Sequence, residues 1–212
     1  MLIVLLFILK WIRNELEEDY DDVENLTREA FWNVYRPGCN EHLVIHNLWK
    51  EKCFIKELDY VIEKDNKIIA NIVYAKSKIT QDNGITKDIL IFGPISVLPE
   101  YQKKGYGSYI IKYTMNKAKE MGYIEIAITG NPDYYHRFGF ESASKYKIYY
   151  EGIDRKEESP FFVLNILDKS KFNIEPGVYS DPSVYKVDPK EPEEFEKKFP
   201  SKVKEKRPGQ LE

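Results

Sequence analysis

Two structural signals follow one another between Gly93 and Ser108, and together they constrain the fold more than any other part of the chain. An apolar strand ends there in a short polar loop that carries Gly105 and Gly107, and a long amphipathic helix follows directly. A further strand, from Ile124 to Thr129, comes straight after that helix, with isoleucines alternating along it. A strand, a helix and a strand in this order predict a right-handed crossover between parallel neighbours. The chain is therefore expected to form an α/β fold around a mixed sheet.

The glycine loop is suited to an anionic group. Gly105 and Gly107 allow several backbone N–H groups to point toward one place, at the positive end of the helix that follows. The nucleotide loop of ATPases is absent, because Lys103 and Lys104 precede the glycine. The dinucleotide fingerprint is also incomplete, since a third glycine is missing. The loop therefore predicts phosphate binding but disfavours an ATPase or a dehydrogenase.

Composition excludes several classes of partner. The chain has 212 residues, which suits one domain with an appendage. Its formal net charge of −3 gives no sign of the basic surface that nucleic-acid binding requires. Cys39 and Cys53 have neither metal-type nor disulfide-framework spacing, so a reducing cytoplasm is the default compartment. His42 and His46 are four residues apart, but no third ligand accompanies them, so no metal is predicted.

The apolar start, Met1 to Leu9, is too short to span a bilayer, because a spanning helix needs about 20 apolar residues and the run stops at Lys10. It also lacks the basic start and small-residue cleavage site of a secretory signal. A buried first strand that continues through Trp11 and Ile12 is the favoured interpretation. No membrane partner is expected, and a weak surface anchor stays open as the alternative.

The composition shifts after Lys169, where six of the 11 prolines lie among many Lys and Glu residues. This shift predicts a domain over 1–168 and an extension over 169–212, with one short helix near 193–198. Residues 146–150 and 161–167 are expected to form the last antiparallel pair of the domain.

Two motifs at matching spacing resemble those of the GNAT superfamily of N-acetyltransferases. The first lies at the strand–helix junction and reads Val97-x-Pro99-x-x-Gln102-x-x-Gly105-x-Gly107. The second follows the next strand and reads Tyr135-x-x-x-Gly139-Phe140. The resemblance covers about 12–167 and looks closest to a bacterial subgroup of largely unassigned substrates. It implies a mixed central sheet of about six to seven strands with a splayed parallel pair and helices on both faces.

The resemblance also implies acetyl-CoA as cosubstrate, with its pyrophosphate on the loop. The residues expected there are Gln102, Lys103, Lys104, Gly105, Tyr106, Gly107 and Ser108. The pantetheine arm would lie between the splayed strands and bond the backbone of Ile95 and Val97. Pro99, with a bulge, is expected to end the strand pairing and open that gap. Asn131 would hold a water or the cofactor arm, although helix capping also explains it.

The catalytic roles implied by the family fall on two residues. The N–H of Val97 would polarise the thioester carbonyl and stabilise its oxyanion. Tyr135 would protonate the leaving thiolate as general acid, whereas Tyr134 is expected to be packing. The acceptor pocket is assigned to Glu41, His42 and Glu57, each of which also has an ordinary surface or capping interpretation.

The sequence therefore predicts an acetyl-CoA-dependent N-acetyltransferase acting on a primary amine of a small molecule or a protein. A non-catalytic acyl-CoA sensor is the alternative, and a membrane-associated interaction protein is a third. The acceptor, the general base, the acyl-chain preference and the oligomeric state, a homodimer included, stay open.

Overall fold

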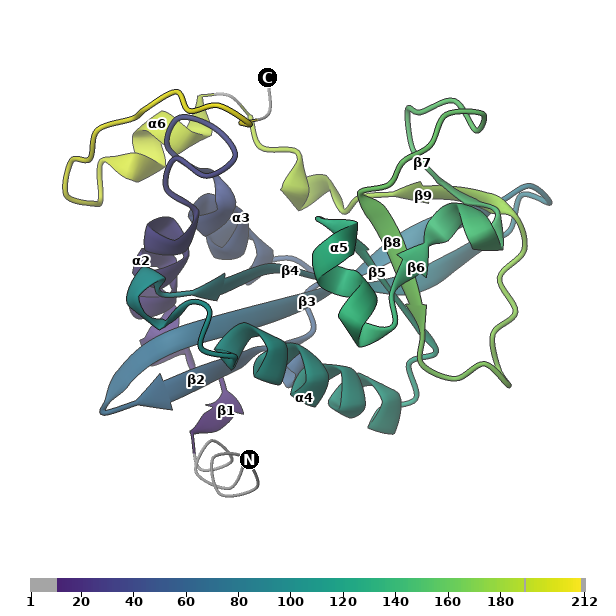
Figure 1. The fold of residues 1–212 in the computed structure, drawn as a ribbon, viewed down its shortest axis with the longest axis horizontal. Helices are drawn as coiled ribbons and strands as arrows, with labels where there is room; N and C mark the ends of the chain where they lie inside the picture. The colour runs from purple at the N-terminus through teal and green to yellow at the C-terminus, as the bar shows by residue number, and fades with distance from the viewer. Residues whose placement is uncertain (1–10, 189, 211–212) are drawn as a thin grey trace.

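A mixed β-sheet runs through the structure, a computed structural model that describes residues 11–188 and 190–210 (Figure 1). Seven of the nine strands in this part of the chain lie in the order β1-β2-β3-β4-β5-β8-β6, and β9 pairs with both β3 and β7. The strands are β1 (Ile12–Asn14), β2 (Tyr60–Lys64), β3 (Lys67–Gln81), β4 (Thr86–Val97), β5 (Glu125–Thr129), β6 (Glu141–Ser142), β7 (Ile148–Tyr150), β8 (Phe162–Ile166) and β9 (Gly177–Ser180).

Five α-helices accompany the sheet in the described residues: α2 (Tyr20–Phe31), α3 (Glu41–Leu48), α4 (Tyr106–Glu120), α5 (Pro132–Tyr135) and α6 (Glu191–Glu196). The short 3₁₀ turns are η1 (Glu17–Asp19), η2 (Lys56–Leu58), η3 (Pro99–Tyr101), η4 (His136–Phe138), η5 (Ala143–Tyr146) and η6 (Ser183–Tyr185).

The predicted crossover is confirmed, because α4 connects the parallel neighbours β4 and β5. Their pairing is short: it joins Leu90 to Ile126 and Ile91 to Ala127. Toward Val97, β4 stays paired with β3 and leaves β5. The two strands are therefore splayed at the end where the glycine loop begins, as a GNAT fold requires.

A bulge in β4 marks the start of the splay. Phe92 lies opposite Tyr74 and Ile95 lies opposite Ile72, so Gly93 and Pro94 together face a single residue of β3. Gly93 has φ +135, a conformation that favours glycine. Pro94 has no N–H to give to either neighbouring strand. The proline at the opening is therefore Pro94.

The expectation that Pro99 opens the gap between β4 and β5 was wrong. Pro99 begins the η3 turn after the strand has already ended at Val97. Its fixed φ suits the first position of a helical turn, so it helps to start the loop and does not open the gap.

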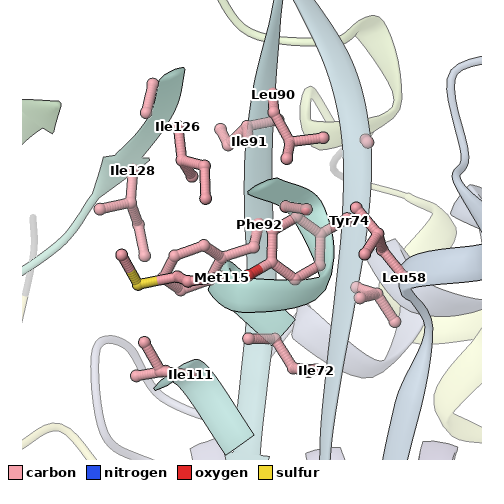
Figure 2. Packing of buried hydrophobic residues seen from close by; sticks show 14 of the residues in the cluster. Leu58, Ile72, Tyr74, Leu90, Ile91, Phe92, Ile111, Met115, Ile126 and Ile128 are labelled. Atoms are coloured by element: carbon pink, nitrogen blue, oxygen red, sulfur yellow. The ribbon is translucent and has the colours of Figure 1, made fainter. Parts of the chain in front are cut away.

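The helices cover both faces of the sheet. On one face, the Tyr74 hydroxyl is 2.9 Å from Thr114 Oγ1 of α4. On the other face, Ser96 Oγ donates to Thr27 Oγ1 of α2 at 3.1 Å. Figure 2 shows the core on the α4 face, where Phe92 and Tyr74 lie among isoleucines of β5 and Met115 of α4. Aromatic and branched side chains thus fill the space beneath the splayed strands.

The last strands pair differently from the prediction. β7 does not pair with β8: it runs parallel to β9, whereas β8 lies between β5 and β6. β9 also pairs antiparallel with β3, from Lys78 opposite Ser180 to Gln81 opposite Gly177. These additional strands explain why the sheet exceeds the expected six to seven. A short strand between Pro176 and Pro182 has no hydrophobic run long enough to announce it.

Beyond β9 the chain continues along the α2 and α3 face. Figure 1 shows it leaving β9, passing through the yellow-green turn η6 and reaching α6 beside α2 and α3. The short helix expected near 193–198 is found as α6, shifted by about one half-turn.

The first strand is described only from Trp11 onward. β1 pairs antiparallel with β2, with Ile12 opposite Ile62. The apolar run Met1 to Leu9 lies outside the described residues. None of the helices within 11–188 and 190–210 is long and apolar enough to cross a bilayer.

Candidate active site

The loop between η3 and α4 presents a row of free backbone donors. The first α4 amide with a protein acceptor is that of Tyr109, which donates to Gly105 O at 2.9 Å. In the described residues, the N–H groups of 103–108 donate to no protein acceptor. They lie at the N-terminus of a 15-residue helix, whose dipole favours an anion. The predicted loop therefore has the geometry of a phosphate site.

Glycine is required at the two positions of the loop for different structural reasons. Gly105 is the N-cap of α4 and has φ +92, which side chains other than glycine resist. Gly107 keeps a space open: a Cβ there would lie 3.2 Å from the Tyr134 hydroxyl and 3.5 Å from Val97 Cγ2. The loop is thus bounded by β4 on one side and by Tyr134 of α5 on the other.

Backbone groups of β4 face the gap left by the splay. Leu98 N–H donates to Ile69 O of β3 at 3.0 Å. Because backbone groups alternate along an antiparallel strand, the N–H groups of Ile95 and Val97 point away from β3, toward the side that β5 has left. Gln102 Nε2 donates to Val97 O at 3.0 Å, on that same side. Gln102 therefore contributes its side chain to holding the strand end, and the Val97 N–H is left for a ligand.

Tyr135 lies on the α4 face of the sheet, close to the start of the splay. Its ring packs edge-on against Phe92 at 5.9 Å and Phe140 at 5.8 Å, and the residue is 8 % exposed. A Cβ on Gly130 would come within 2.5 Å of Tyr135 Cε2, so glycine is needed there. Burial raises the pKa of Tyr135, with the charges of Tyr134 and Tyr35 adding to the effect. The phenol is therefore protonated at neutral pH, and the raised pKa makes it a weaker acid than an exposed tyrosine.

The remaining predicted cofactor residues are placed around the loop. Lys103 and Lys104 are exposed on its rim, and Lys104 Nζ donates to Glu100 O at 2.7 Å. Tyr106 packs against Tyr101 at 6.0 Å. Asn131 caps α5, accepting from the Asp133 N–H at 2.9 Å. Capping thus accounts for Asn131, and its role toward a cofactor stays a prediction.

Glu41 is placed near the expected acceptor side. Its carboxylate accepts from the Asn40 N–H at 2.9 Å, and burial raises its pKa. Its charge adds to the burial that raises the pKa of Tyr35, whose own charge acts on Tyr135. The role of Glu41 toward an acceptor stays a prediction.

His42 is not available to a substrate, so its assignment to an open pocket was wrong. Its side chain is fully buried, with Nε2 3.2 Å from Glu196 Oε2 and Nδ1 3.4 Å from Cys39 Sγ. Phe195 and Phe199 pack against the ring. Burial lowers the pKa of His42 to about 4, which keeps the ring neutral. His42 thus anchors the C-terminal extension on α3.

Glu57 lies toward the other end of α4 from the glycine loop, and its role in an acceptor pocket stays a prediction. It is exposed on η2 and lies near Tyr123, whose pKa is raised by burial and then by the Glu57 charge. Tyr123 follows the C-terminal end of α4, whereas the glycine loop precedes its N-terminal end. A helix of this length spans about 22 Å, so Glu57 is far from the loop.

A surface cavity of about 410 Å³ lies elsewhere, next to His136, Glu141 and Lys169. Neither Tyr135 nor the glycine loop lines it. The free amides and the splayed strands are the candidate active site, because their chemistry suits a ligand, whereas Glu141 of the cavity already pairs with Lys145.

Sequence reasoning missed three residues of the site. Tyr134 was expected to be packing, yet its hydroxyl lies over Gly107, with the Arg137 guanidinium 4.5 Å from its ring centre. The Tyr134–Tyr135 doublet was a signal that both phenols face the site. Gly130, directly before the Asn131 cap, was a second signal. Pro94, inside a strand, was a third, because central strands exclude proline.

Comparisons with known proteins agree with this geometry. Residues 56–142 match the family model described as Acetyltransferase (GNAT) domain. The chain is 25 % identical over 135 residues to YjhQ, an uncharacterised N-acetyltransferase of Escherichia coli (strain K12), covering 63 % of this chain and 70 % of that protein.

Two solved structures share the fold. The GNAT family N-acetyltransferase YhbS from Escherichia coli, in complex with CoA, superposes with a TM-score of 0.71 at 20 % identity, covering 83 % of this chain and 91 % of that one. A GNAT family acetyltransferase from Brucella melitensis, in complex with acetyl-CoA, gives 0.65 at 22 % identity, covering 82 % and 96 %. The match over 56–142 and the shared fold therefore make the chain similar to GNAT N-acetyltransferases, which are acyltransferases that use acetyl-CoA.

Proposed function

We propose that the chain transfers the acetyl group of acetyl-CoA to a primary amine of a small molecule or a protein, by direct attack of the amine on the thioester. The observation that carries this proposal is the row of free amides from Lys103 to Ser108, placed beside a gap into which the N–H groups of Ile95 and Val97 point. Such backbone donors can bind a diphosphate and an arm that carries amide groups.

Two groups of residues, one at each end of the gap, would bind acetyl-CoA. The amides of 103–108 would hold the diphosphate, and the space kept by Gly107 would admit it close to the helix. Lys103 and Lys104 would add positive charge from the rim. The backbone of Ile95 and Val97 would pair with the arm as a further strand would.

Two groups of the chain would then act on the thioester that acetyl-CoA supplies when bound. The Val97 N–H would donate to the carbonyl oxygen and stabilise negative charge there. Tyr135, kept protonated by burial, would give its proton to the departing sulfur. Glu41 is the candidate for receiving the proton of the amine, because its burial raises its pKa toward the working range of a base.

We also propose that the acetyltransferase domain predicted over 1–168 uses residues 169–212 as an extension that completes it. This is supported by the pairing of β9 with β3 and by the contacts of α6 with α2 and α3.

The substitution Tyr135→Phe tests the chemical step. It should lower kcat by about 10- to 1,000-fold while the dissociation constant for acetyl-CoA stays unchanged, because only the proton donor is removed. Calorimetry gives the affinity, and thiol release with a panel of amines, amino acids and peptides gives the rate. Tyr146→Phe is the matched control, since its hydroxyl bonds Glu141 away from the site.

Two outcomes would contradict the proposal. Amide resonances of 103–108 that do not move at saturating CoA would exclude the binding site. Tight acetyl-CoA binding with no transfer to any amine of the panel would instead favour an acyl-CoA sensor.

A further inference from the structure

The C-terminal extension contacts β4 at the start of the strand, where Lys87 Nζ donates to Asn173, and again beside the candidate active site. The hydroxyl of Tyr185, in η6, donates to the carbonyl oxygen of Gly93. The two residues are 92 positions apart in the chain. Burial raises the pKa of Tyr185, so its phenol stays a hydrogen-bond donor. Tyr185 therefore brings the extension to β4 beside the candidate active site.

That point is the bulge of β4. Gly93 and Pro94 are the two residues that face one residue of β3, and the last β4–β5 pair, Ile91 with Ala127, lies directly before them. The ladder with β5 thus ends, and the ladder with β3 is interrupted, next to the carbonyl that Tyr185 binds. The direction of this peptide is set by the bulge and by Tyr185, because a disrupted ladder leaves it otherwise free.

The direction of the bulge sets the orientation of the backbone groups beyond it. Ile95 and Val97 come two and four residues after Gly93, and their N–H groups face the gap only because the strand resumes its alternation after the bulge. A change at Gly93 therefore reorients the donors proposed to bind the thioester arm and its carbonyl oxygen.

Tyr185 approaches from the side of α3, which η6 contacts. Cys53, in the segment after α3, is close enough for its charge to act on Tyr185 and raise its pKa. The extension is fixed there from both ends. Before η6, Asp181 accepts from the Tyr150 and Tyr179 hydroxyls; after it, Glu196 pairs with Arg28 and His42. Tyr185 is thus held in place by contacts that do not depend on the bulge.

We propose that Tyr185 is a positioning residue of the transfer reaction: from the α3 side of the sheet, it fixes the β4 bulge and so aims the Ile95 and Val97 amides at the thioester. The proposal rests on the proposed function, and it makes the extension a working part of the active site.

The test compares Tyr185→Phe with the wild-type protein and with Tyr146→Phe. Thiol release measures two reactions: acetyl transfer to spermidine, glycinamide and a lysine-containing peptide, and hydrolysis of acetyl-CoA. Tyr185→Phe should lower kcat about tenfold, the worth of one well-made hydrogen bond. The acetyl-CoA dissociation constant should change less than twofold, because the phosphate loop is not touched. Tyr146→Phe should change neither quantity.

A spectroscopic measurement reports on the contact itself. Gly93–Pro94 is the only Gly–Pro pair in the sequence, so protein labelled with ¹³C-carbonyl glycine and ¹⁵N-proline gives one doubly labelled peptide, at the bulge. Its carbonyl resonance should shift in Tyr185→Phe and stay in place in Tyr146→Phe. An equal melting temperature in both variants excludes general unfolding.

The outcomes separate the two proposals. An unmoved Gly93 carbonyl, or an unchanged kcat in Tyr185→Phe while Tyr135→Phe is impaired, overturns the role of Tyr185 and leaves the acetyltransferase standing. A wild-type protein that binds no acetyl-CoA, or shows neither transfer nor hydrolysis, overturns the proposed function and this role with it.

Discussion

Glu15 and Asp59 bring two carboxyl groups into the interior where β1 meets β2. They are 2 % and 1 % exposed, and Glu15 N–H donates to Asp59 O at 3.1 Å. Neither oxygen of the Glu15 carboxyl has a hydrogen-bond partner among the described residues, nor does Asp59 Oδ1. Burial raises the pKa of both groups, and the Asp59 charge raises that of Glu15 further. The pair is therefore most stable when it holds a proton.

The pair predicts a loss of stability in alkaline solution. Carboxyls in the unfolded chain ionise near pH 4, so the folded state binds more protons than the unfolded state above that pH. The free energy of unfolding should fall as the pH rises, by up to about 1.4 kcal/mol per pH unit for one proton.

Urea unfolding at pH 5 and pH 8 measures this difference. Asp59→Asn should make it smaller, whereas Asp88→Asn, an exposed carboxylate of β4, should leave it as in the wild type. Identical pH profiles for wild type and Asp59→Asn would show that the pair is ionised in the folded protein.

Among the elements, α6 is bound to the domain by the buried Phe195, which packs on His42, and by one carboxylate. Glu196 pairs with the Arg28 guanidinium of α2, whose side chain is 3 % exposed, and it also contacts His42 of α3. Arg28 donates as well to Pro200 O at 2.8 Å. The extension thus supplies the counter-charge for a cation buried beneath it.

Glu196→Gln should therefore cost about 3 kcal/mol of unfolding free energy, because it leaves the buried guanidinium without its charged partner. Glu194→Gln is the matched control on the same helix: its side chain is 75 % exposed and pairs with Lys197, so little change is expected. Chemical denaturation of the three proteins measures both effects. Equal losses for the two variants would mean that the Arg28 pair adds no more than a surface pair does.

How far the sequence could predict each element depends on how local its determinants are. The order β4, α4, β5 and the phosphate loop were predictable, because each is encoded within a few consecutive residues such as Gly105 and Gly107. The contacts of His42 with Glu196 and of Tyr185 with Gly93 join positions 154 and 92 residues apart. No local pattern announces such pairs, so the burial of His42 under Glu196 and the contact of the extension with β4 were not predicted.

For the whole molecule, the division at residue 168 can be tested by truncation. Removing 169–212 takes away β9 and uncovers the edge of β3, where Ile79 is fully buried opposite Tyr179. It also removes the partner of β7. The truncated chain should therefore aggregate, since an unpaired apolar edge is a template for intermolecular pairing.

Truncation before Ser201 keeps β9, η6 and α6, and it should leave a soluble protein. Size-exclusion chromatography separates the two outcomes. A monodisperse, cooperatively unfolding product of 1–168 would show that the extension is dispensable for the fold.

The position of β9 has a consequence for how the chain is made. β3 and β9 lie side by side, yet Ser77 and Ser180 are 103 residues apart, and synthesis delivers β3 long before its neighbour. A polypeptide emerging from the ribosome must keep that half of β3 bare for several seconds, at about 5–20 residues per second. Chaperones that shield nascent strands should therefore be retained until the last quarter of the protein has emerged.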